Sequence, residues 1–167
     1  LKTAGVTLVL AASAKLSMIL TVPFFLVYLY TNPAVRQYAI QFYVSLTITG
    51  LTLASFFLIS QNGMLMLFNN PEMGSAFKLS LEMPGGKKIY LSVLLYALTV
   101  YAFWRIGRLN FDLFQSAIGI GLLLFVLITP SSMGWFIWCL PFIVLYQMES
   151  DRTGTSLFVL FSVTYAM

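Results

Sequence analysis

The sequence TPSSMGWFIWCLP at residues 129–141 decides how the chain is expected to fold, because a polar turn here separates two long apolar runs. The second run begins with Trp135 and Trp138, which are three residues apart and would share one face of a helix. Tryptophan at the head of an apolar run is typical of the membrane–water boundary. Pro141 lies in the same run and removes a backbone donor, which favours a kink. The stretch therefore predicts a turn at a membrane surface leading into a bent membrane helix; the alternative is an ordinary loop before an ordinary spanning helix.

The composition of the whole chain agrees with a membrane protein. Of its 167 residues, 60% are hydrophobic and 8% are charged, and the mean hydropathy is +0.92. Average soluble domains carry about 25% charged residues, and a soluble domain of this length could not bury so much apolar surface. We therefore expect residues 1–167 to form a single all-α region, a polytopic transmembrane helix bundle of about five to six spans.

Charge and residue counts exclude several classes of function. The nine Lys and Arg residues outnumber the five Asp and Glu residues, giving a net charge of +4. In a membrane protein this surplus reports orientation and lipid contact, so no nucleic-acid partner is expected. The absence of histidine from the sequence excludes a Ser-His-Asp triad and the usual His-rich zinc sites, and no metal site is expected. Cys139 is the single cysteine, so an intrachain disulfide is impossible.

Both ends of the sequence predict a fragment of a larger multi-span protein. The chain begins at Leu1 and becomes apolar almost at once. It ends in an apolar run, residues 157–167, that is too short to cross about 30 Å of hydrocarbon. We therefore expect truncation at both ends and neighbouring helices supplied by a missing N-terminal part.

Apolar stretches alternate with short polar connections along the chain. The stretches expected to be helical cover residues 6–30, 38–60, 89–104, 113–128 and 134–148. The first is either one long tilted helix or two helices divided near residues 13–15, and Pro23 favours a bend or break. Residues 61–88 form the longest non-spanning segment, with a turn at 84–86, and their apolar run at 64–68 is expected at the membrane interface or packed under the loop.

Two pairs of small residues predict close contacts between helices. Gly50 with Ala54, and Ala117 with Gly121, are each four residues apart and so lie on one helical face.

The distribution of cations predicts the orientation. The connections of one side carry Arg36, Arg105, Arg108 and Arg152, and the long segment on the other side carries Lys78, Lys87 and Lys88. Short loops weigh more in setting topology. The arginine side is therefore predicted to be cytoplasmic, and residues 61–88 and the turn at Pro130 are predicted to lie outside.

Lys15 is the most informative charged residue, because it lies within apolar sequence. A lysine at the centre of a membrane helix costs about 2.5–3.5 kcal/mol, so it usually faces protein, water or a headgroup. It is a candidate for binding an anionic lipid phosphate or pyrophosphate; alternatively it ends a helix and extends to the headgroups. Outside the membrane only Glu72 and Glu82 could act as a base, and both are expected to be solvated loop charges.

The turn after residue 129 is a candidate lining of an outer cavity. Trp135 and Trp138 could stack on a sugar or line a lipid groove, or they could form an interfacial aromatic belt without a ligand. The candidate cavity-lining residues are Pro130, Ser131, Ser132, Gly134, Trp135, Trp138 and Pro141.

Residues 129–142 resemble the late Pro/Gly-Trp-aromatic-x-Trp-x-x-Pro-Phe segment of bacterial GT-C-type membrane glycosyltransferases. The sequence AKLS at residues 14–17, followed by Pro23-Phe24, is similar to their lysine-containing segment before a Leu/Pro-rich helix. Residues 104–113 lie as expected between the two. The chain departs from related late segments at Pro130-Ser131-Ser132, where those segments often hold a histidine.

The resemblance implies sugar transfer from a polyprenyl-phosphate donor on the outer face of a membrane, as in a bacterial inner membrane. It implies a lipid-linked sugar donor, with Lys15 at the donor phosphate and no other cofactor. It also implies a catalytic acidic residue upstream of this chain, so the fragment alone is expected to be inactive. Two other classes remain open: a segment of a multi-pass transporter or flippase, with Pro23 and Pro141 marking broken helices, and a non-catalytic membrane scaffold.

Overall fold

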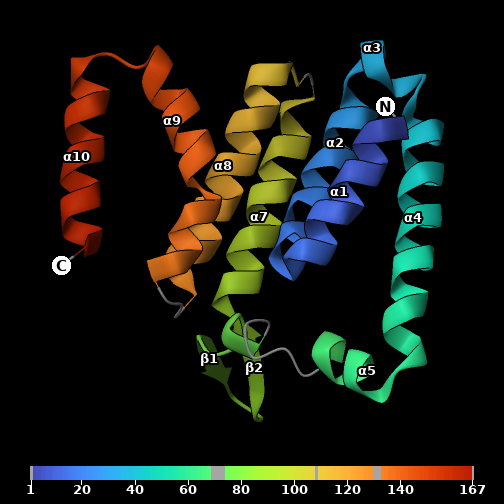
Figure 1. Cartoon of the computed structure of the whole chain (residues 1–167). Helices are drawn as coiled ribbons and strands as arrows, with labels where there is room; N and C mark the ends of the chain where they lie inside the picture. The colour runs from blue at the N-terminus through green and yellow to red at the C-terminus, as the bar shows by residue number, and fades with distance from the viewer. Residues whose placement is uncertain (1, 69–73, 108, 130–132, 167) are drawn as a thin grey trace.

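A computed structural model describes residues 2–68, 74–107, 109–129 and 133–166 as a row of helices with a two-stranded hairpin at one end (Figure 1). In chain order the elements are α1 (Lys2–Ala14), the 3-10 helix η1 (Leu16–Thr21), α2 (Val22–Thr31), α3 (Pro33–Arg36), α4 (Ala39–Ile59), α5 (Gln61–Phe68), β1 (Ser80–Met83), β2 (Lys87–Tyr90), α7 (Leu91–Ile106), α8 (Phe111–Ile128), the 3-10 helix η2 (Met133–Trp138), α9 (Leu140–Glu149) and α10 (Arg152–Ala166). The predicted helical class is confirmed, whereas the hairpin was not predicted.

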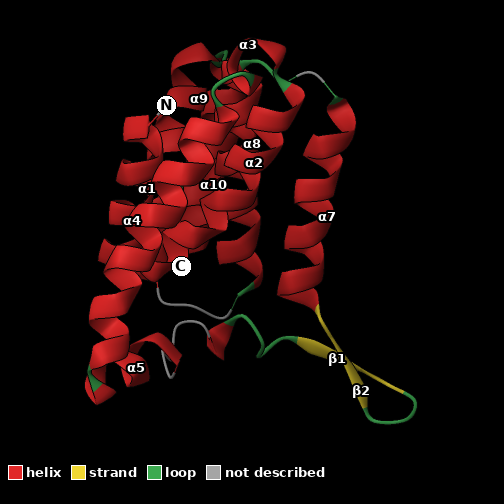
Figure 2. Ribbon diagram, turned by 90° about the vertical axis from the view of Figure 1, so that its right-hand side faces the viewer, coloured by secondary structure: helices red, strands yellow, loops and turns green. Residues whose placement is uncertain are grey.

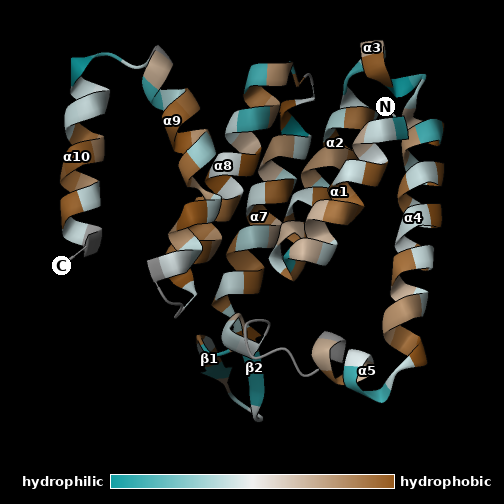
Figure 3. Ribbon diagram, viewed as in Figure 1, coloured by the Kyte–Doolittle hydropathy of each residue, from teal (hydrophilic) through white to brown (hydrophobic). Residues whose placement is uncertain are grey.

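Among the described residues, α4 and α8 are the helices long and apolar enough to cross a membrane by themselves. The other apolar helices are shorter: Lys2–Ala14, Leu16–Thr31 and Leu91–Ile106. The prediction of five to six spans is therefore not supported. The physical reason is that the helices are shorter than the apolar runs predicted to span, while a spanning helix needs about 20 residues. The extended residue Lys15 divides residues 6–30, β2 takes up the start of residues 89–104, and the 3-10 helix η2 replaces the start of an α-helix at residues 134–148. Figure 3 shows apolar residues along α4, α7 and α8, and a largely polar β2.

Helix α8 forms the centre of the larger core cluster. Its buried face packs against the side chains of α2 and η2, and it includes Ala117 and Gly121, as the small-residue pattern predicted. A Cβ atom added at Gly121 would lie 2.3 Å from Cζ of Phe24, so the glycine allows the ring to sit directly against the helix backbone. Phe24 is 1% exposed and makes edge contacts with the rings of Tyr96 and Phe103.

A second, smaller cluster joins α1 to α4. A Cβ at Gly5 would lie 2.2 Å from Oγ of Ser45 and 2.8 Å from the carbonyl oxygen of Phe42. The predicted close contact at Gly50 does not occur within the described chain, since a Cβ there would meet nothing within 4 Å. The tight crossing of α4 therefore lies nearer its N-terminus than the sequence pattern indicated.

Two of the apolar stretches predicted to be helical are interrupted, each next to a 3-10 helix. Lys15 is extended, with φ −146° and ψ 111°, so residues 6–30 form two helical pieces, which confirms one of the two alternatives. Residues 134–148 were predicted as one kinked helix, and that form is wrong. Instead η2 ends at Trp138 and α9 begins after Cys139. Pro141 lies in the first turn of α9, where backbone N–H groups have no partner within the helix, so proline costs no hydrogen bond there.

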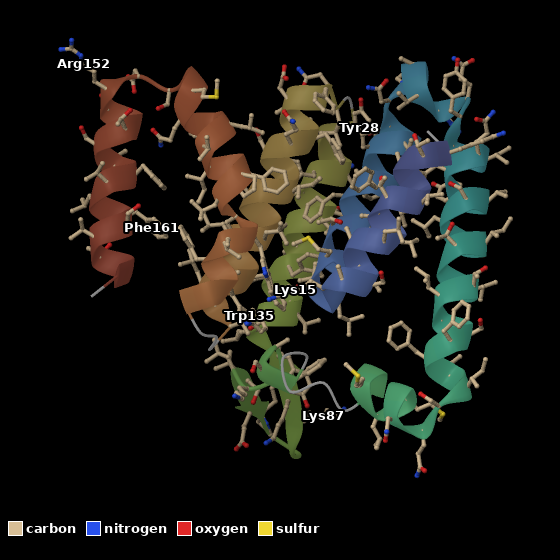
Figure 4. The ribbon with its side chains drawn as sticks, viewed as in Figure 1. Lys15, Tyr28, Lys87, Trp135, Arg152 and Phe161 are labelled. Carbon is tan, nitrogen blue, oxygen red and sulfur yellow. The ribbon has the colours of Figure 1, made fainter. Side chains whose placement is uncertain are left out.

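The connections gather at two ends of the row of helices. Arg36 in α3 and Arg152 at the start of α10 lie at one, here called the arginine end; the β-hairpin, with Lys87, lies at the other, here called the hairpin end (Figures 1 and 4). At the arginine end Nδ2 of Asn32 donates to the carbonyl oxygen of Leu109 at 2.9 Å. The predicted separation from the lysine-bearing segment is thus matched for Arg36 and Arg152, while Arg108 lies outside the described residues.

The hairpin forms at the turn that the sequence placed at residues 84–86. Gly85 and Gly86 have φ values of 88° and 73°, a conformation that favours glycine. The strands are antiparallel, with Leu81 opposite Ile89 and Met83 opposite Lys87. Figure 2 shows the hairpin projecting sideways beyond α7, away from the rest of the helices.

Candidate functional site

The hairpin end brings together the lysine and the tryptophans that the sequence singled out separately. Nζ of Lys15 lies 4.7 Å from the centre of the Trp138 ring. The rings of Trp135 and Trp138 are stacked, with centroids 4.6 Å apart and planes inclined by 28°. Figure 4 shows Lys15 and Trp135 close to one another near the lower end of the helices. A cation over stacked indoles is an electrostatically favourable arrangement.

Local backbone structure produces this geometry. A 3-10 helix has three residues per turn, so side chains at positions i and i+3 eclipse one another. In η2 this aligns Trp135 with Trp138 and stacks their rings. On the other side, the extended conformation of Lys15 ends α1 and directs the chain into η1, which leaves the lysine at the junction of two helical pieces.

A cavity of about 270 Å³ lies beside this pair. Its lining residues are Leu16, Ser17, Ile19, Leu20, Ala76, Phe77, Val93, Tyr96, Phe125 and Trp135. Most of the lining is apolar, and the polar atoms are few. The Tyr96 hydroxyl donates to the carbonyl oxygen of Leu20, which fixes the ring between α7 and η1. Ligand sites of this kind typically combine apolar walls with a few placed polar groups.

Four buried polar side-chain atoms have no hydrogen-bond partner among the described residues. They are Oγ of Ser17, Oγ of Ser92, Oγ1 of Thr129 and Nε1 of Trp138. Ser92 lies at the start of α7 and Thr129 directly after α8, so both are at the hairpin end, as are η1 and η2. Because buried polar groups are nearly always satisfied, this concentration at one end of the bundle indicates a place where a polar ligand group or water would be bound.

The predicted site residues are only partly brought together. Trp135 lines the cavity, and Lys15 and Trp138 adjoin it. Gly134 and Pro141 are exposed, and neither residue lines the cavity of about 270 Å³ or the larger groove between α8, α9 and α10. The predicted cavity-lining residues Pro130, Ser131 and Ser132 lie outside the described residues.

Apart from Trp135, sequence reasoning did not predict the residues that line this cavity, and three of them show why. Ser17 lies two residues after Lys15, and that proximity was an available signal. Tyr96 is an aromatic residue in the middle of an apolar run and offered no signal of its own. Phe77 belongs to a segment predicted only as a loop, and it reaches the cavity from the covering segment before β1.

A larger groove of about 510 Å³ lies between α8, α9 and α10 and was not predicted. Asp112, Gln115 and Gln147 contribute polar atoms to its lining, and Phe142 and Phe158 contribute apolar surface. It contains none of the predicted site residues. Among the described residues there is also no group of three or more His, Cys, Asp and Glu side chains that could hold a metal ion.

The chain matches no protein-family model, no curated protein and no solved structure. The site is therefore interpreted from its own residues.

Proposed function

We propose that this chain is the C-terminal membrane portion of a GT-C-like glycosyltransferase, which takes a sugar from a polyprenyl-phosphate donor at the outer face of a membrane. The observation that carries the proposal is the position of the Lys15 ammonium group, 4.7 Å from the centre of the Trp138 ring. From the sequence, Lys15 was a candidate for binding a lipid phosphate and Trp138 for contact with a sugar or a lipid, and the two residues belong to segments far apart in the chain. Their meeting beside an apolar cavity supports one site for a phosphorylated isoprenoid.

The surroundings of Lys15 match the three chemical parts of such a donor. The ammonium group provides three donors for phosphate oxygens. Oγ of Ser17 and Nε1 of Trp138, both buried and unpartnered within the described chain, provide further donors nearby. The apolar cavity of about 270 Å³ suits the first isoprene units, and the Trp135 ring in its lining suits contact with a sugar.

Embedding in a membrane is the condition for this function. Helices α4 and α8 are long and apolar enough to cross one. Within the described chain, α4 buries a single residue, Phe42, so most of its apolar surface needs lipid or further helices. With the arginine end in the cytoplasm, the hairpin end and its cavity face outward, as expected for an enzyme of a bacterial inner membrane.

The described residues equip this end to hold a donor rather than to catalyse transfer. Of the carboxylates that the structure describes, Glu82 belongs to the hairpin end, and it is 76% exposed and paired with Lys88 at 3.1 Å. Asp112 lies in the first turn of α8 at the opposite end. Transfer to a hydroxyl acceptor requires a base within hydrogen-bonding reach, which this proposal assigns to a part of the protein outside the chain.

The proposal is tested by photoaffinity labelling of the protein in nanodiscs with a diazirine-bearing polyprenyl monophosphate. Lys15→Gln is expected to weaken labelling about 10-fold or more, because charge-assisted hydrogen bonds to phosphate contribute about 1.5–3 kcal/mol. Lys15→Arg should retain most of the binding. Lys2→Gln, at an exposed position near the arginine end, is the matched control and should bind as the unaltered protein does. Equal labelling of the Lys15→Gln variant and the control would refute the site.

A second candidate function, a transporter or flippase, is favoured by one observation. Both η1–α2 and η2–α9 begin with a six-residue 3-10 helix followed by a ten-residue α-helix that has proline in its first turn. Discontinuous helices of this kind surround substrate sites in many transporters. Reconstituted protein separates the two functions: a flippase moves fluorescent polyprenyl phosphate across the bilayer without a sugar or acceptor, and a glycosyltransferase does not.

A further inference from the structure

The β-hairpin has one apolar face, although it lies outside the helical core. In the observed register, side chains of paired residues share a face and alternate along each strand. One face therefore carries Leu81, Met83 and Ile89, with Lys87 beside the turn. The opposite face carries the ion pair of Glu82 and Lys88, together with Ser80 and Tyr90.

The apolar face is open at Leu81 and Met83, whereas Ile89 is half-buried. Leu81 is 55% exposed and Met83 is 47% exposed. An isolated two-stranded hairpin is at best marginally stable in water, so its apolar face needs a surface to pack against. Figure 2 shows that the hairpin extends past α7 at the level where the helices end. The exposure of Leu81 and Met83 shows that the rest of the described chain leaves this part of the face uncovered.

The charge of the hairpin region is positive. The described part of this region contains three lysines, Lys78, Lys87 and Lys88, and one carboxylate, Glu82. Glu82 pairs with Lys88 at 3.1 Å. Lys87 lies on the apolar face and next to the turn, where its long side chain can reach past the apolar residues to a headgroup. Lys78 is exposed just before β1. Lysines flanking an exposed apolar face are typical of segments that lie on anionic lipid.

We infer that the apolar face of the hairpin docks on the surface of the surrounding bilayer and that Lys78 and Lys87 bind anionic phospholipid headgroups there. The inference rests on the membrane embedding in the proposed function, and not on sugar transfer. If the bundle is embedded, a hairpin that leaves it sideways at the helix ends lies over lipid. Anionic phospholipid supplies both the apolar layer and the negative charge that the hairpin lacks a partner for.

Docking of the hairpin on the bilayer would also restrain one wall of the cavity beside Lys15, because the two are linked by contacts. The rings of Phe77 and Tyr90 form an edge-to-face contact with centroids 5.1 Å apart. Tyr90 ends β2, whereas Phe77 lines the cavity beside Lys15. The backbone N–H of Leu91 donates to the carbonyl oxygen of Leu79 at 3.0 Å. A hairpin held on the bilayer would therefore also hold Phe77 and the segment before β1 that lines the cavity.

The test measures the depth of a fluorophore attached at Met83→Cys, in a Cys139→Ala background, with the whole chain in nanodiscs. Two compositions are compared: phosphatidylcholine alone, and phosphatidylcholine with phosphatidylglycerol. With phosphatidylglycerol present, the label should be quenched by a quencher on lipid chains and protected from a water-soluble quencher. The substitutions Lys78→Gln and Lys87→Gln should each lower the equilibrium constant for docking about 5-fold. The control substitution Lys2→Gln should leave it unchanged.

Position-matched labels make the result decisive. A label at Ser80→Cys, on the opposite face, should remain open to the water-soluble quencher. A label at Leu51→Cys, 67% exposed on α4, should be quenched from the lipid chains if the bundle is embedded. The inference would be overturned if the water-soluble quencher reached the label at Met83→Cys in both lipid compositions while the label at Leu51→Cys was quenched from the lipid chains. That result would leave the proposed donor site unaffected. Protection of Met83 from both quenchers would also overturn the inference, because protein would then cover the face.

Discussion

The contact between Gly121 and Phe24 predicts that Gly121→Ala destabilises the bundle. The added Cβ would lie 2.3 Å from Cζ and 2.7 Å from Cε2 of the ring, closer than non-bonded carbon atoms can approach. The ring has little room to move, because Phe24 is 1% exposed and packs edge-on against Tyr96 and Phe103, with centroids 5.9 Å and 6.1 Å away. Either α8 or the aromatic cluster must shift.

Two opposing effects set the size of the change. Overpacking a well-packed core costs about 1–3 kcal/mol. Alanine is a better helix former than glycine by up to about 1 kcal/mol, which offsets part of that cost. We expect a net loss of about 1–2 kcal/mol in the free energy of unfolding for Gly121→Ala. The matched control is Gly50→Ala in α4, where a Cβ meets nothing within 4 Å and the change should be neutral or slightly stabilising.

The chain carries its own reporter for this measurement. Cys139 is the single cysteine of the sequence, is 0% exposed and belongs to the same core cluster as Phe24. Its thiol should react with a maleimide only when the core opens. In detergent micelles, native-state labelling of Gly121→Ala should be about 5- to 30-fold faster than that of the unaltered protein, and labelling of Gly50→Ala should not be faster.

A compensating variant shows whether the ring is the cause. Phe24→Leu shortens the side chain that meets the new methyl group, so the cost of Gly121→Ala should be smaller in that background than alone. If Gly121→Ala labels at the rate of the unaltered protein, or if the two changes are simply additive, the close contact does not control packing and the reasoning is wrong.

Two further variants probe other contacts. Gly5→Ala should weaken the packing of α1 on α4 by about 1–3 kcal/mol, and Ser45→Ala should restore only part of the loss, because the carbonyl oxygen of Phe42 remains 2.8 Å from the new Cβ; unfolding midpoints of both variants provide the check. Asn32→Ala should cost about 1–2 kcal/mol, since Asn32 caps α3 and donates to the carbonyl oxygen of Leu109. Asn32→Asp keeps the cap and loses the donor, so its unfolding midpoint should fall between those of Asn32→Ala and the unaltered protein.

Features that depend on local chemistry were predictable from the sequence. The break near Lys15 follows from a charge within an apolar run, and the turn at Gly85-Gly86 follows from glycine. The close approach at Gly121 follows from small residues on one helical face. The shared face of Trp135 and Trp138 was predicted for an α-helix, and the 3-10 helix aligns them more closely still.

Features that depend on distant contacts were not predictable. The strands of the hairpin are short and mix charged with apolar residues, so their alternation was not recognised as a strand pattern. The predicted number of spans is not supported, because hydropathy does not reveal that β2 takes up the start of residues 89–104 or that η2 replaces an α-helix at the start of residues 134–148. The meeting of Lys15 with Trp138 arises from how η1 and η2 pack beside α8, and no pattern within either segment contains that information.

The 3-10 geometry of η1 changes how far its segment reaches. A 3-10 helix rises about 2.0 Å per residue, compared with about 1.5 Å in an α-helix. With its six residues stretched in this way, the segment Leu16–Thr31 extends about 27 Å, whereas the same residues in a regular α-helix would extend about 24 Å. The tighter winding of these six residues thus lengthens the segment by about 3 Å, at the end that follows Lys15.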